Sequence, residues 1–279
     1  MAIVETDLLI DADELNSLVI GLTASNDSGS THQYQHKKAQ VLYVVDGFIS
    51  IFVGNVEHIV PPRRAIWIPP GVKHTTRTSE GTSYRSLFVH QNVSSLFPKT
   101  IKIVDTNSLM RELIERMVLW NWDKPIRQQQ PMFTVLCDEM NMLESESLSL
   151  VYPEDRRLID WLYALQEGEM KPQPLKEMAR DIGASSKTIS RIFTRETGMA
   201  YQYWRQRWRL HEAICLLSNG SPVTDVAKSL DFSSVSAFIS FFRKIAGDTP
   251  GRYLVSGCLH PLQHHKSDDV RSISAEICD

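Results

Sequence analysis

Residues 175–197, LKEMARDIGASSKTISRIFTRET, decide the expected fold of the C-terminal third of this chain. Apolar side chains recur there with helical spacing, at Leu175, Met178, Ala179 and Ile182. Gly183 then ends the helix, because glycine takes the left-handed conformation after a helix at little cost. Ser185 can cap a second helix by accepting backbone N–H bonds. The segment therefore predicts two helices joined by a tight turn.

The second predicted helix has two different faces. Its apolar face carries Ile189, Ile192 and Phe193, and its outer face is polar and cationic. Such a pair is typical of the DNA-binding helix-turn-helix, whose second helix enters the major groove. We therefore predict DNA contacts from Lys187, Ser190, Arg191, Thr194 and Arg195. Arg191 is the expected base reader because its planar guanidinium can bond guanine O6 and N7 together; the alternative is a surface ion pair.

The same arrangement recurs 48 residues later in residues 223–245, VTDVAKSLDFSSVSAFISFFRKI. One such helix pair is weak evidence, whereas two that match position for position indicate an internal duplication. Asp231 stands where the first turn has Gly183, and we expect base specificity to rest mostly on the first motif. The outward-facing candidates of the second motif are Ser234, Ser236, Ser240, Arg243 and Lys244.

A probable linking helix over residues 200–217 connects the two motifs. Trp204 and Trp208 lie four residues apart on it, and the expectation is that they belong to the core rather than to a contact surface. Arg205 and Arg209 form a parallel strip. These two arginines are predicted to meet DNA phosphate, with surface ion pairs as the alternative.

Charge is distributed unevenly along the 279 residues, whose net charge is −3. Residues 171–210 contain nine basic and three acidic side chains, a local charge of +6, so the remainder carries −9. A basic region joined to an acidic remainder suits a DNA-binding part with a separate sensing part. On charge alone, a solvated helix face without a partner is an equal alternative.

Short apolar runs separated by turn signals fill residues 40–89. The breaks include Asp46-Gly47, Gly54-Asn55 and the proline pairs at 61–62 and 69–70. Strands at such near-regular spacing predict an antiparallel sandwich or barrel.

Residues around this barrel resemble the two sequence motifs of the cupin family. His36, Gln40 and Gly47 match the first motif, and Pro69, Gly71 and His74 match the second. The chain departs from the family pattern in having Tyr34 for the first histidine, Gln40 for the glutamate and Thr78 for the usual asparagine.

The cupin resemblance implies that these side chains converge inside the barrel. The expected effector-binding residues are Tyr34, His36, Gln40 and His74. A divalent metal is the candidate cofactor, with His36, Gln40 and His74 as ligands and His32 as a further donor. Two imidazoles and a neutral amide lack the charge that holds a divalent ion tightly, so a metal-free pocket is the alternative.

Residues of about 155–254 resemble the DNA-binding domain of the AraC/XylS family. The resemblance lies in the two motifs quoted above, and PEDRRL at 153–158 and SAFISFFR at 236–243 resemble its NimR-like subgroup. It implies a transcription regulator that binds double-stranded promoter DNA under control of a small-molecule or metal effector. A homodimer is the expected assembly, with RNA polymerase as a further partner if the regulator is an activator.

The expected fold class is therefore α+β with two domains, a cupin-like β-barrel followed by an all-α double helix-turn-helix domain. Apolar helical spacing over 107–120 and 132–143 predicts two further helices, which serve either packing or dimerisation. The predicted boundaries are 1–98 for the barrel, 99–152 for a helical coupling segment ending in a linker, 153–257 for the DNA-binding domain and 258–279 for a mobile tail. Within the third, the motifs span about 174–197 and 222–245.

The rest of the composition narrows the class of protein. The four cysteines form no CxxC pair, no signal peptide is recognisable, and no apolar run reaches the ~20 residues of a membrane span. A cytoplasmic protein that does not act on membranes is expected. The rival is a metal-dependent cupin enzyme of dioxygenase or isomerase type fused to a DNA-binding domain. Cys258, His260, His264 and His265 in the tail are a weak candidate metal cluster.

Overall fold

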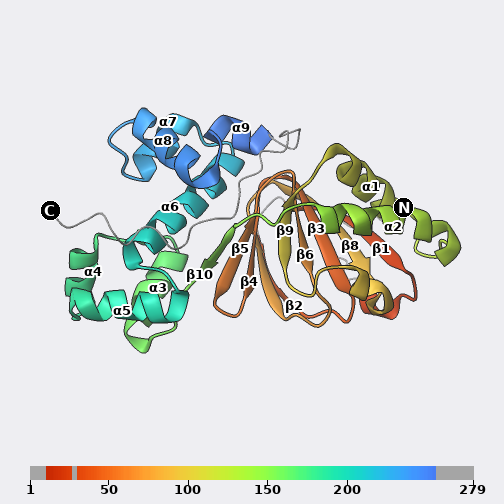
Figure 1. Ribbon diagram of the computed structural model, residues 1–279, viewed down its shortest axis with the longest axis horizontal. Coiled ribbons are helices and arrows are strands. Elements are labelled where there is room, and N and C mark those ends of the chain that lie inside the picture. Colours follow the sequence, from red (N-terminus) through yellow and green to blue (C-terminus); the bar gives the residue numbers. More distant parts are fainter. Residues whose placement is uncertain (1–10, 27–29, 256–279) are drawn as a thin grey trace.

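The computed structural model describes residues 11–26 and 30–255. Figure 1 shows a β-rich part and an all-helical part, with the short strand β10 (Ser149–Val151) running between them. The predicted α+β fold with two domains is confirmed. The predicted tail with its cysteine and histidines lies outside the described residues.

The β-rich part consists of two five-stranded sheets in which every neighbouring pair is antiparallel. The first sheet has the order β1 (Val19–Asn26), β8 (Thr82–Val89), β3 (Ala39–Asp46), β6 (Arg64–Ile68) and β9 (Lys102–Asp105). The second has the order β10, β5 (Val56–Val60), β4 (Ile49–Val53), β7 (His74–Thr78) and β2 (Ser30–Tyr34).

Alternation along β3 shows how the first sheet divides its two faces. Leu42 and Val44 lie in the core that fills the barrel, whereas Val41 and Tyr43 lie in a second core on the outer face. Period-two alternation of this kind is what a strand buried on both faces requires. Helices α1 (Ser108–Val118) and α2 (Ile126–Met142) cover that outer face. A Cβ at Gly21 of β1 would lie 2.3 Å from Val118 Cα, so α1 sits against a strand that needs glycine there.

The strands expected within residues 40–89 are all present, but five others were not anticipated, of which β1 precedes the expected region. β2 and β7 have the sequences STHQY and HTTRT, which are polar and lack apolar alternation. β9 lies beyond residue 98, where the barrel was expected to end, and β10 lies inside the expected linker. The coupling segment thus contributes two strands as well as its two helices.

The helical part contains two helix-turn-helix units at the two ends of one long helix, α6 (Tyr201–Ser218), as Figure 1 shows. The remaining helices are α3 (Ile159–Gln166), α4 (Leu175–Asp181), α5 (Ser186–Thr197), α7 (Val223–Ser229), α8 (Val235–Ala246) and α9 (Pro250–Val255). Across the residues described, no helix has the length and apolar character needed to cross a bilayer.

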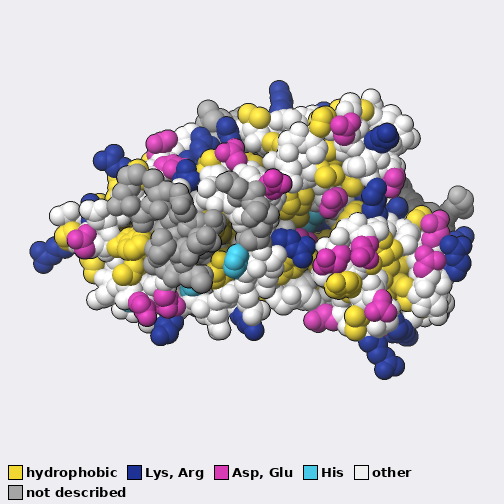
Figure 2. Space-filling view, turned by 180° about the vertical axis from the view of Figure 1, so that it is seen from behind, with side chains coloured by type: hydrophobic (Ala, Val, Ile, Leu, Met, Phe, Trp, Pro, Cys, Tyr) yellow, Lys and Arg dark blue, Asp and Glu magenta, His cyan; other side chains and the backbone are white. Residues whose placement is uncertain are grey.

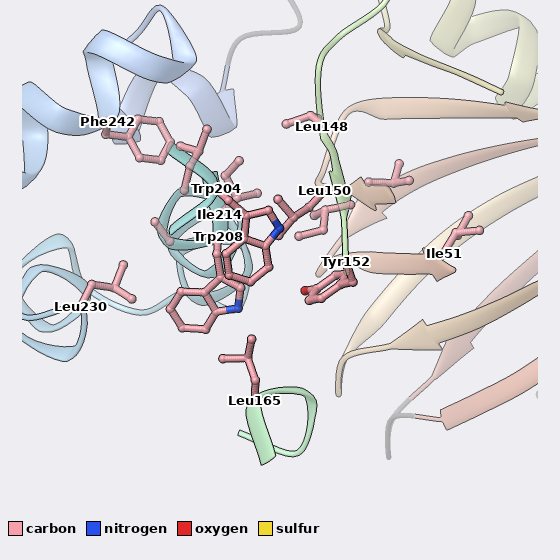
Figure 3. Close-up of a cluster of buried hydrophobic side chains, with 14 of the residues drawn as sticks. Ile51, Leu148, Leu150, Tyr152, Leu165, Trp204, Trp208, Ile214, Leu230 and Phe242 are labelled. Atoms are coloured by element: carbon pink, nitrogen blue, oxygen red, sulfur yellow. The ribbon is translucent and has the colours of Figure 1, made fainter. Parts of the chain in front are cut away.

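An aromatic cluster holds the first unit to α6. Phe193 of α5 is fully buried, with its ring centroid 4.8 Å from that of Tyr201 and 5.1 Å from that of Trp204. Trp204 in turn donates its indole N–H to the carbonyl of Val151 at 2.7 Å. Figure 3 shows Trp204 beside Leu150 and Tyr152 of the segment that leaves the barrel. The core is therefore continuous from the helical part into β10.

Buried Arg64 of β6 makes a second connection between the parts. Its side chain is 2% exposed, and its Nε lies 3.2 Å from a Glu146 carboxylate oxygen. One guanidinium nitrogen donates to the carbonyl of Tyr253 in α9 at 3.2 Å, and the group lies 4.7 Å from the Tyr253 ring centroid. The neighbouring Arg63 donates to the carbonyl of Val255 at 2.9 Å. Two arginines of the barrel thus hydrogen-bond to backbone carbonyls of α9, the helix that follows the second unit.

Replacing Phe193 by alanine should destabilise the helical part by about 3–5 kcal/mol, because the buried ring leaves a cavity at the centre of the aromatic cluster. Chemical denaturation followed by circular dichroism measures the change. Tyr203→Ala is the matched control, since Tyr203 is 52% exposed on α6. An unchanged unfolding midpoint for Phe193→Ala would mean that the buried face of α5 is misassigned.

Candidate nucleic-acid interface and sensor pocket

The first helix-turn-helix has the local geometry that its sequence predicts. Gly183 follows α4 with φ +71°, the left-handed conformation. Ser185 Oγ then accepts the backbone N–H of Thr188 at 3.1 Å and caps α5. Ile189, Ile192 and Phe193 are buried, which turns the opposite face of α5 to solvent.

The predicted DNA-contact residues of α5 do not share one environment. Lys187, Arg191 and Thr194 are exposed, and Ser190 is half-buried. Within the described part of the chain, Arg191 has no ion-pair partner. The guanidinium of Arg191 is therefore available to a partner outside the protein.

Arg195 at the end of α5 is in a different position. It lies 3.3 Å from a carboxylate oxygen of Asp155 and also forms an ion pair with Glu196. Arg157, again bonded to Asp155, is first among the causes that hold the pKa of that carboxyl well below its ordinary value. Glu196 in turn accepts the backbone N–H groups of Glu154 and Asp155. The ion-pair alternative thus describes Arg195 well, because it ties α5 to the segment entering α3.

The second unit repeats this design with a changed turn. Asp231 takes φ +57° at the position of Gly183, a conformation that aspartate tolerates better than most residues. α7 follows α4 by 48 residues, but α8 follows α5 by 49, so the second turn is one residue longer. By that offset Phe238 and Phe242 occupy the buried places of Ile189 and Phe193, and Ser240 takes the place of Arg191.

The predicted contact residues of the second unit also divide into two kinds. Ser234 caps α8, because its Oγ accepts the backbone N–H of Ala237 at 3.1 Å. Exposed side chains on α8 are Ser236, Ser240, Arg243 and Lys244. At the position where α5 has Arg191, α8 therefore has a serine hydroxyl. The exposed cations of α8, Arg243 and Lys244, lie in its last turn.

The cations of α6 are used inside the domain rather than presented to solvent. Arg205 Nε donates to the carbonyl of Pro172 at 2.6 Å. Arg209 donates to the carbonyl of Leu230 at 2.7 Å and lies 4.8 Å from the Phe232 ring centroid. Both arginines therefore hold loops of the two units in place, and we do not retain them as phosphate ligands. Trp204 and Trp208 are buried, which confirms that they belong to the core.

Charges of both signs are interspersed on the face seen in Figure 2. The molecule therefore does not present a single broad basic field on that side. Attraction to phosphate is therefore expected from local groups of cations rather than from a broad field, in keeping with a net charge of −3 for the chain.

The four predicted effector residues converge at one end of the barrel interior. The ring centroid of Tyr34 lies 5.5 Å from that of His36 and 5.9 Å from that of His74, and the two histidine centroids are 6.0 Å apart. Gln40 faces the same interior, where its Nε2 donates to Ser86 Oγ at 2.7 Å. The four residues come from β2, the connection between β2 and β3, β3 itself and β7.

This cluster of four side chains offers hydrogen-bond acceptors to a ligand. Gln40 Oε1 is buried without a hydrogen-bond partner among the described residues. His74 Nδ1 donates to the carbonyl of Val72 at 2.9 Å, which leaves Nε2 as an acceptor in the neutral ring. Burial lowers the pKa of both His36 and His74, and the charge of His74 lowers that of His36 further. Neutral imidazoles are therefore the resting state of the site.

These donor atoms suit a metal only partly. Lone pairs on an imidazole and on an amide oxygen are possible metal ligands. However, no group of three or more histidine, cysteine, aspartate or glutamate side chains in the described ranges is arranged to hold a metal ion. The acceptors fit equally an organic effector that brings its own N–H or O–H groups.

Sequence reasoning missed two groups that line this pocket. Phe88 lies 4.9 Å from His36 between ring centroids, and Ser86 binds Gln40. Tyr84, Ser86 and Phe88 alternate along β8 on the inward face, opposite Leu87 and Val89 of the outer core. That alternation is visible in the sequence, but it becomes informative only once the face of β8 is known.

Comparison with known proteins places this geometry among regulators. A family described as a helix-turn-helix domain matches residues 178–255. The chain is 30% identical over 234 residues to the HTH-type transcriptional regulator NimR of Escherichia coli, which covers 83% of this chain and 85% of that protein. It is 24% identical to the thermoregulatory protein LcrF of Yersinia pestis, over 86% of this chain and 88% of LcrF.

Among solved structures, ToxT from Vibrio cholerae aligns with 86% of this chain and 98% of its own length. The sequence identity is 11% and the TM-score is 0.36, which is too low to assign a fold by itself.

The neutral state of the two pocket histidines predicts their titration. In NMR titrations the ring signals of His36 and His74 should titrate below pH 6.5 in the folded protein, and near that ordinary value after unfolding in urea. Because the unfolded chain then binds protons more readily, the contribution of the pair to stability is complete above pH 6.5 and is lost as the pH falls through the lowered pKa. Titration of either ring above pH 6.5 in the folded state would contradict this environment.

Proposed function

Because the chain belongs to the AraC family of helix-turn-helix transcriptional regulators, we propose that it binds a specific promoter site through α5 and α8 under the control of an effector held in the barrel. The observation that carries the proposal is the placement of two recognition helices at the ends of α6 (Figure 1). Eighteen residues of helix rise about 27 Å. That length suits two successive major grooves, which lie ~34 Å apart.

The two helices have unequal roles in reading the site. Arg191 of α5 reads a guanine, with Lys187, Ser190 and Thr194 as neighbouring contacts. On α8, Ser236 and Ser240 supply hydroxyls that discriminate less sharply between bases. Phosphate contacts come from Arg243 and Lys244, which add salt-dependent affinity that is blind to sequence.

The barrel supplies the control. Tyr34, His36, Gln40 and His74 bind an effector rich in hydrogen-bond donors, such as a small organic molecule. A divalent metal held by His36, Gln40 and His74 is the alternative, because the same lone pairs would serve it. Either ligand must bind one arrangement of the two parts better than another in order to regulate.

Assembly and location complete the proposal. Helices α1 and α2 expose Leu109, Leu119 and Val135, between 39% and 57% accessible, on the far side of the barrel from the helical part. This surface suits a homodimer contact. RNA polymerase is a further partner if the regulator is an activator. A promoter-binding role places the protein in the cytoplasm.

A metal-dependent cupin enzyme is the second candidate function. It depends on a metal being bound by His36, Gln40 and His74. The named relatives are regulators, and the pocket contains no carboxylate among its four predicted residues. A stoichiometric redox-active metal would favour an enzyme.

Arg191→Ala should weaken binding to a selected specific site by about 1–3 kcal/mol, or about 5- to 150-fold, because one bidentate base contact is lost. Binding to random DNA should change far less. Fluorescence anisotropy at fixed salt measures both. Lys99→Ala removes one positive charge at an exposed position outside α5, α8 and the α1–α2 surface and is the control. Equal losses on specific and random DNA would make Arg191 a phosphate ligand instead.

The nature of the effector is tested by repeating the specific binding assay with and without a chelator, alongside metal analysis of the purified chain. An organic effector predicts no stoichiometric metal and no response to the chelator. Loss or gain of specific binding on chelation, reversed by adding back one metal and absent in His74→Asn, would replace the organic effector by a metal.

A further inference from the structure

A second cavity lies outside the barrel, between it and the helical part. It has a volume of about 200 Å³. One wall is the outer face of β4, β5 and β7, opposite the face on which β7 carries His74, and the other wall is α6 with the end of α3. Trp208, Leu165 and Tyr152, from three separate segments, lie around it (Figure 3). Because both parts of the molecule contribute, any molecule bound here would contact both.

His211 is a buried side chain in this cavity whose hydrogen-bonding groups lack partners among the described residues. The ring is 2% exposed and lines the cavity, and neither of its nitrogens has a hydrogen-bond partner among the described residues. A buried polar group without a partner costs ~1–3 kcal/mol. Burial, reinforced by the neighbouring Arg207 and His58, lowers the pKa of His211 to about 3, so the ring is neutral. It therefore presents one N–H donor and one acceptor.

Two carboxyl groups, one from each part, also line the cavity. Glu57 belongs to β5 and Glu212 to α6. Burial raises the pKa of both, and the charge of Glu57 raises the pKa of Glu212 further. Glu57 Oε2 accepts the hydroxyl hydrogen of Tyr152 at 2.7 Å. Neither carboxylate forms an ion pair with any residue that the structure describes.

The cations nearest to these carboxylates are already committed or lie at the rim. Arg77 is exposed, donates to the carbonyl of Gln166 at 3.3 Å and lies 5.6 Å from the Phe52 ring centroid. Arg207 donates to Ser147 Oγ at 2.9 Å, and Lys171 is exposed and bonds the carbonyl of Ser229. Arg77 also lines the cavity, but among the described residues neither it nor another cation forms an ion pair with Glu57 or Glu212, so both carboxyl groups can take a further positive partner.

Aromatic side chains make up part of the remaining wall, beside aliphatic and polar ones such as Leu165, Leu216 and Ser50. Phe48, Phe52 and Trp208 line the cavity, and the faces of such rings attract cations. A metal ion is not what this set would hold, because no described group of histidine, cysteine and carboxylate side chains has metal-binding geometry. The space admits a small molecule rather than a single ion.

From this geometry we propose that the cavity between barrel and α6 binds a small organic cation, whose ammonium or amidinium N–H groups are held by Glu57 and Glu212 and by the acceptor nitrogen of His211. The aromatic rings enclose its apolar body. A cation bound to both carboxylates stabilises the arrangement in which the barrel and α6 are packed together. This site is separate from the barrel pocket and does not depend on which effector the barrel takes.

The test uses the full-length chain and two matched pairs of probes, benzamidinium against benzamide and n-butylammonium against n-butanol, at up to millimolar concentration. Binding is measured by calorimetry, by the change in tryptophan fluorescence, to which Trp208 in the cavity wall contributes, and by thermal unfolding. At least one cation should bind saturably, with a raised melting temperature, and its neutral partner should bind at least about tenfold more weakly. Saturable binding by neither cation, or equal binding by the neutral partner, would overturn the proposal and leave the cavity to water.

Variants place the bound cation. Glu57→Gln and Glu212→Gln are isosteric and should each weaken cation binding about tenfold or more, whereas Glu112→Gln, exposed on α1, should not. Asn219→Arg places a tethered guanidinium at an exposed rim position, and it should compete with the probe and raise the unfolding midpoint as the bound cation does. If Asn219→Arg and both glutamine variants retain full affinity, the cation binds elsewhere and the assignment is wrong.

Discussion

Helix α6 is buried around most of its circumference, and the arrangement of everything else depends on that burial. Its buried residues are Tyr201, Trp204, Arg207, Trp208, Leu210, His211, Ala213, Ile214 and Leu217. The N-terminal half receives the first helix-turn-helix through the Phe193 cluster, and the C-terminal half contacts α7, α8 and α9. A third side contacts β10, where Trp204 donates to Val151. One helix therefore sets the separation of both recognition helices and their relation to the barrel.

The same packing suggests how a signal in the barrel reaches DNA. β7 carries His74 on one face and Arg77, which lines the cavity beside α6, on the other, so a ligand on either side acts on the same strand. Arg64 makes separation of the parts costly, because moving α9 away would remove the Tyr253 carbonyl and ring from a buried guanidinium. Regulation then consists of a shift in the populations of two arrangements, the packed one and one suited to binding DNA. The size of the shift is set by the difference in the ligand's affinity for the two.

Some helices and strands could be predicted from the sequence and others could not. The two helix-turn-helix units were predictable because apolar spacing, turn glycine and cap residues all agree within short segments. Strands β3, β4, β5, β6 and β8 were predictable because at least half of the side chains in each are apolar. β2 and β7 were not, because their inward faces line a polar pocket and therefore carry tyrosine, histidine and threonine. β10 was not, because its three residues become a strand only by pairing with β5, far away in the chain.

For the candidate site too, local sequence features were predictable and tertiary contacts were not. The types of residue in the recognition helices and in the barrel pocket followed from spacing and family resemblance. Their contacts within the protein did not follow from the sequence. Arg195 was expected to contact DNA, and Arg205 and Arg209 to contact phosphate, but in the structure tertiary contacts engage all three. His211 and Glu57, on different elements, share a cavity that only the packing of the two parts creates.

The most direct test of the central claim is hydroxyl-radical footprinting of the full-length chain on DNA selected from a random pool. A rigid α6 that carries both recognition helices predicts two protected blocks on one face of the duplex, centred about 10–10.5 base pairs apart. Insertion of half a helical turn between the two blocks should remove protection of one of them. A single protected block, or two blocks that tolerate this insertion, would contradict the placement of both recognition helices by one shared helix.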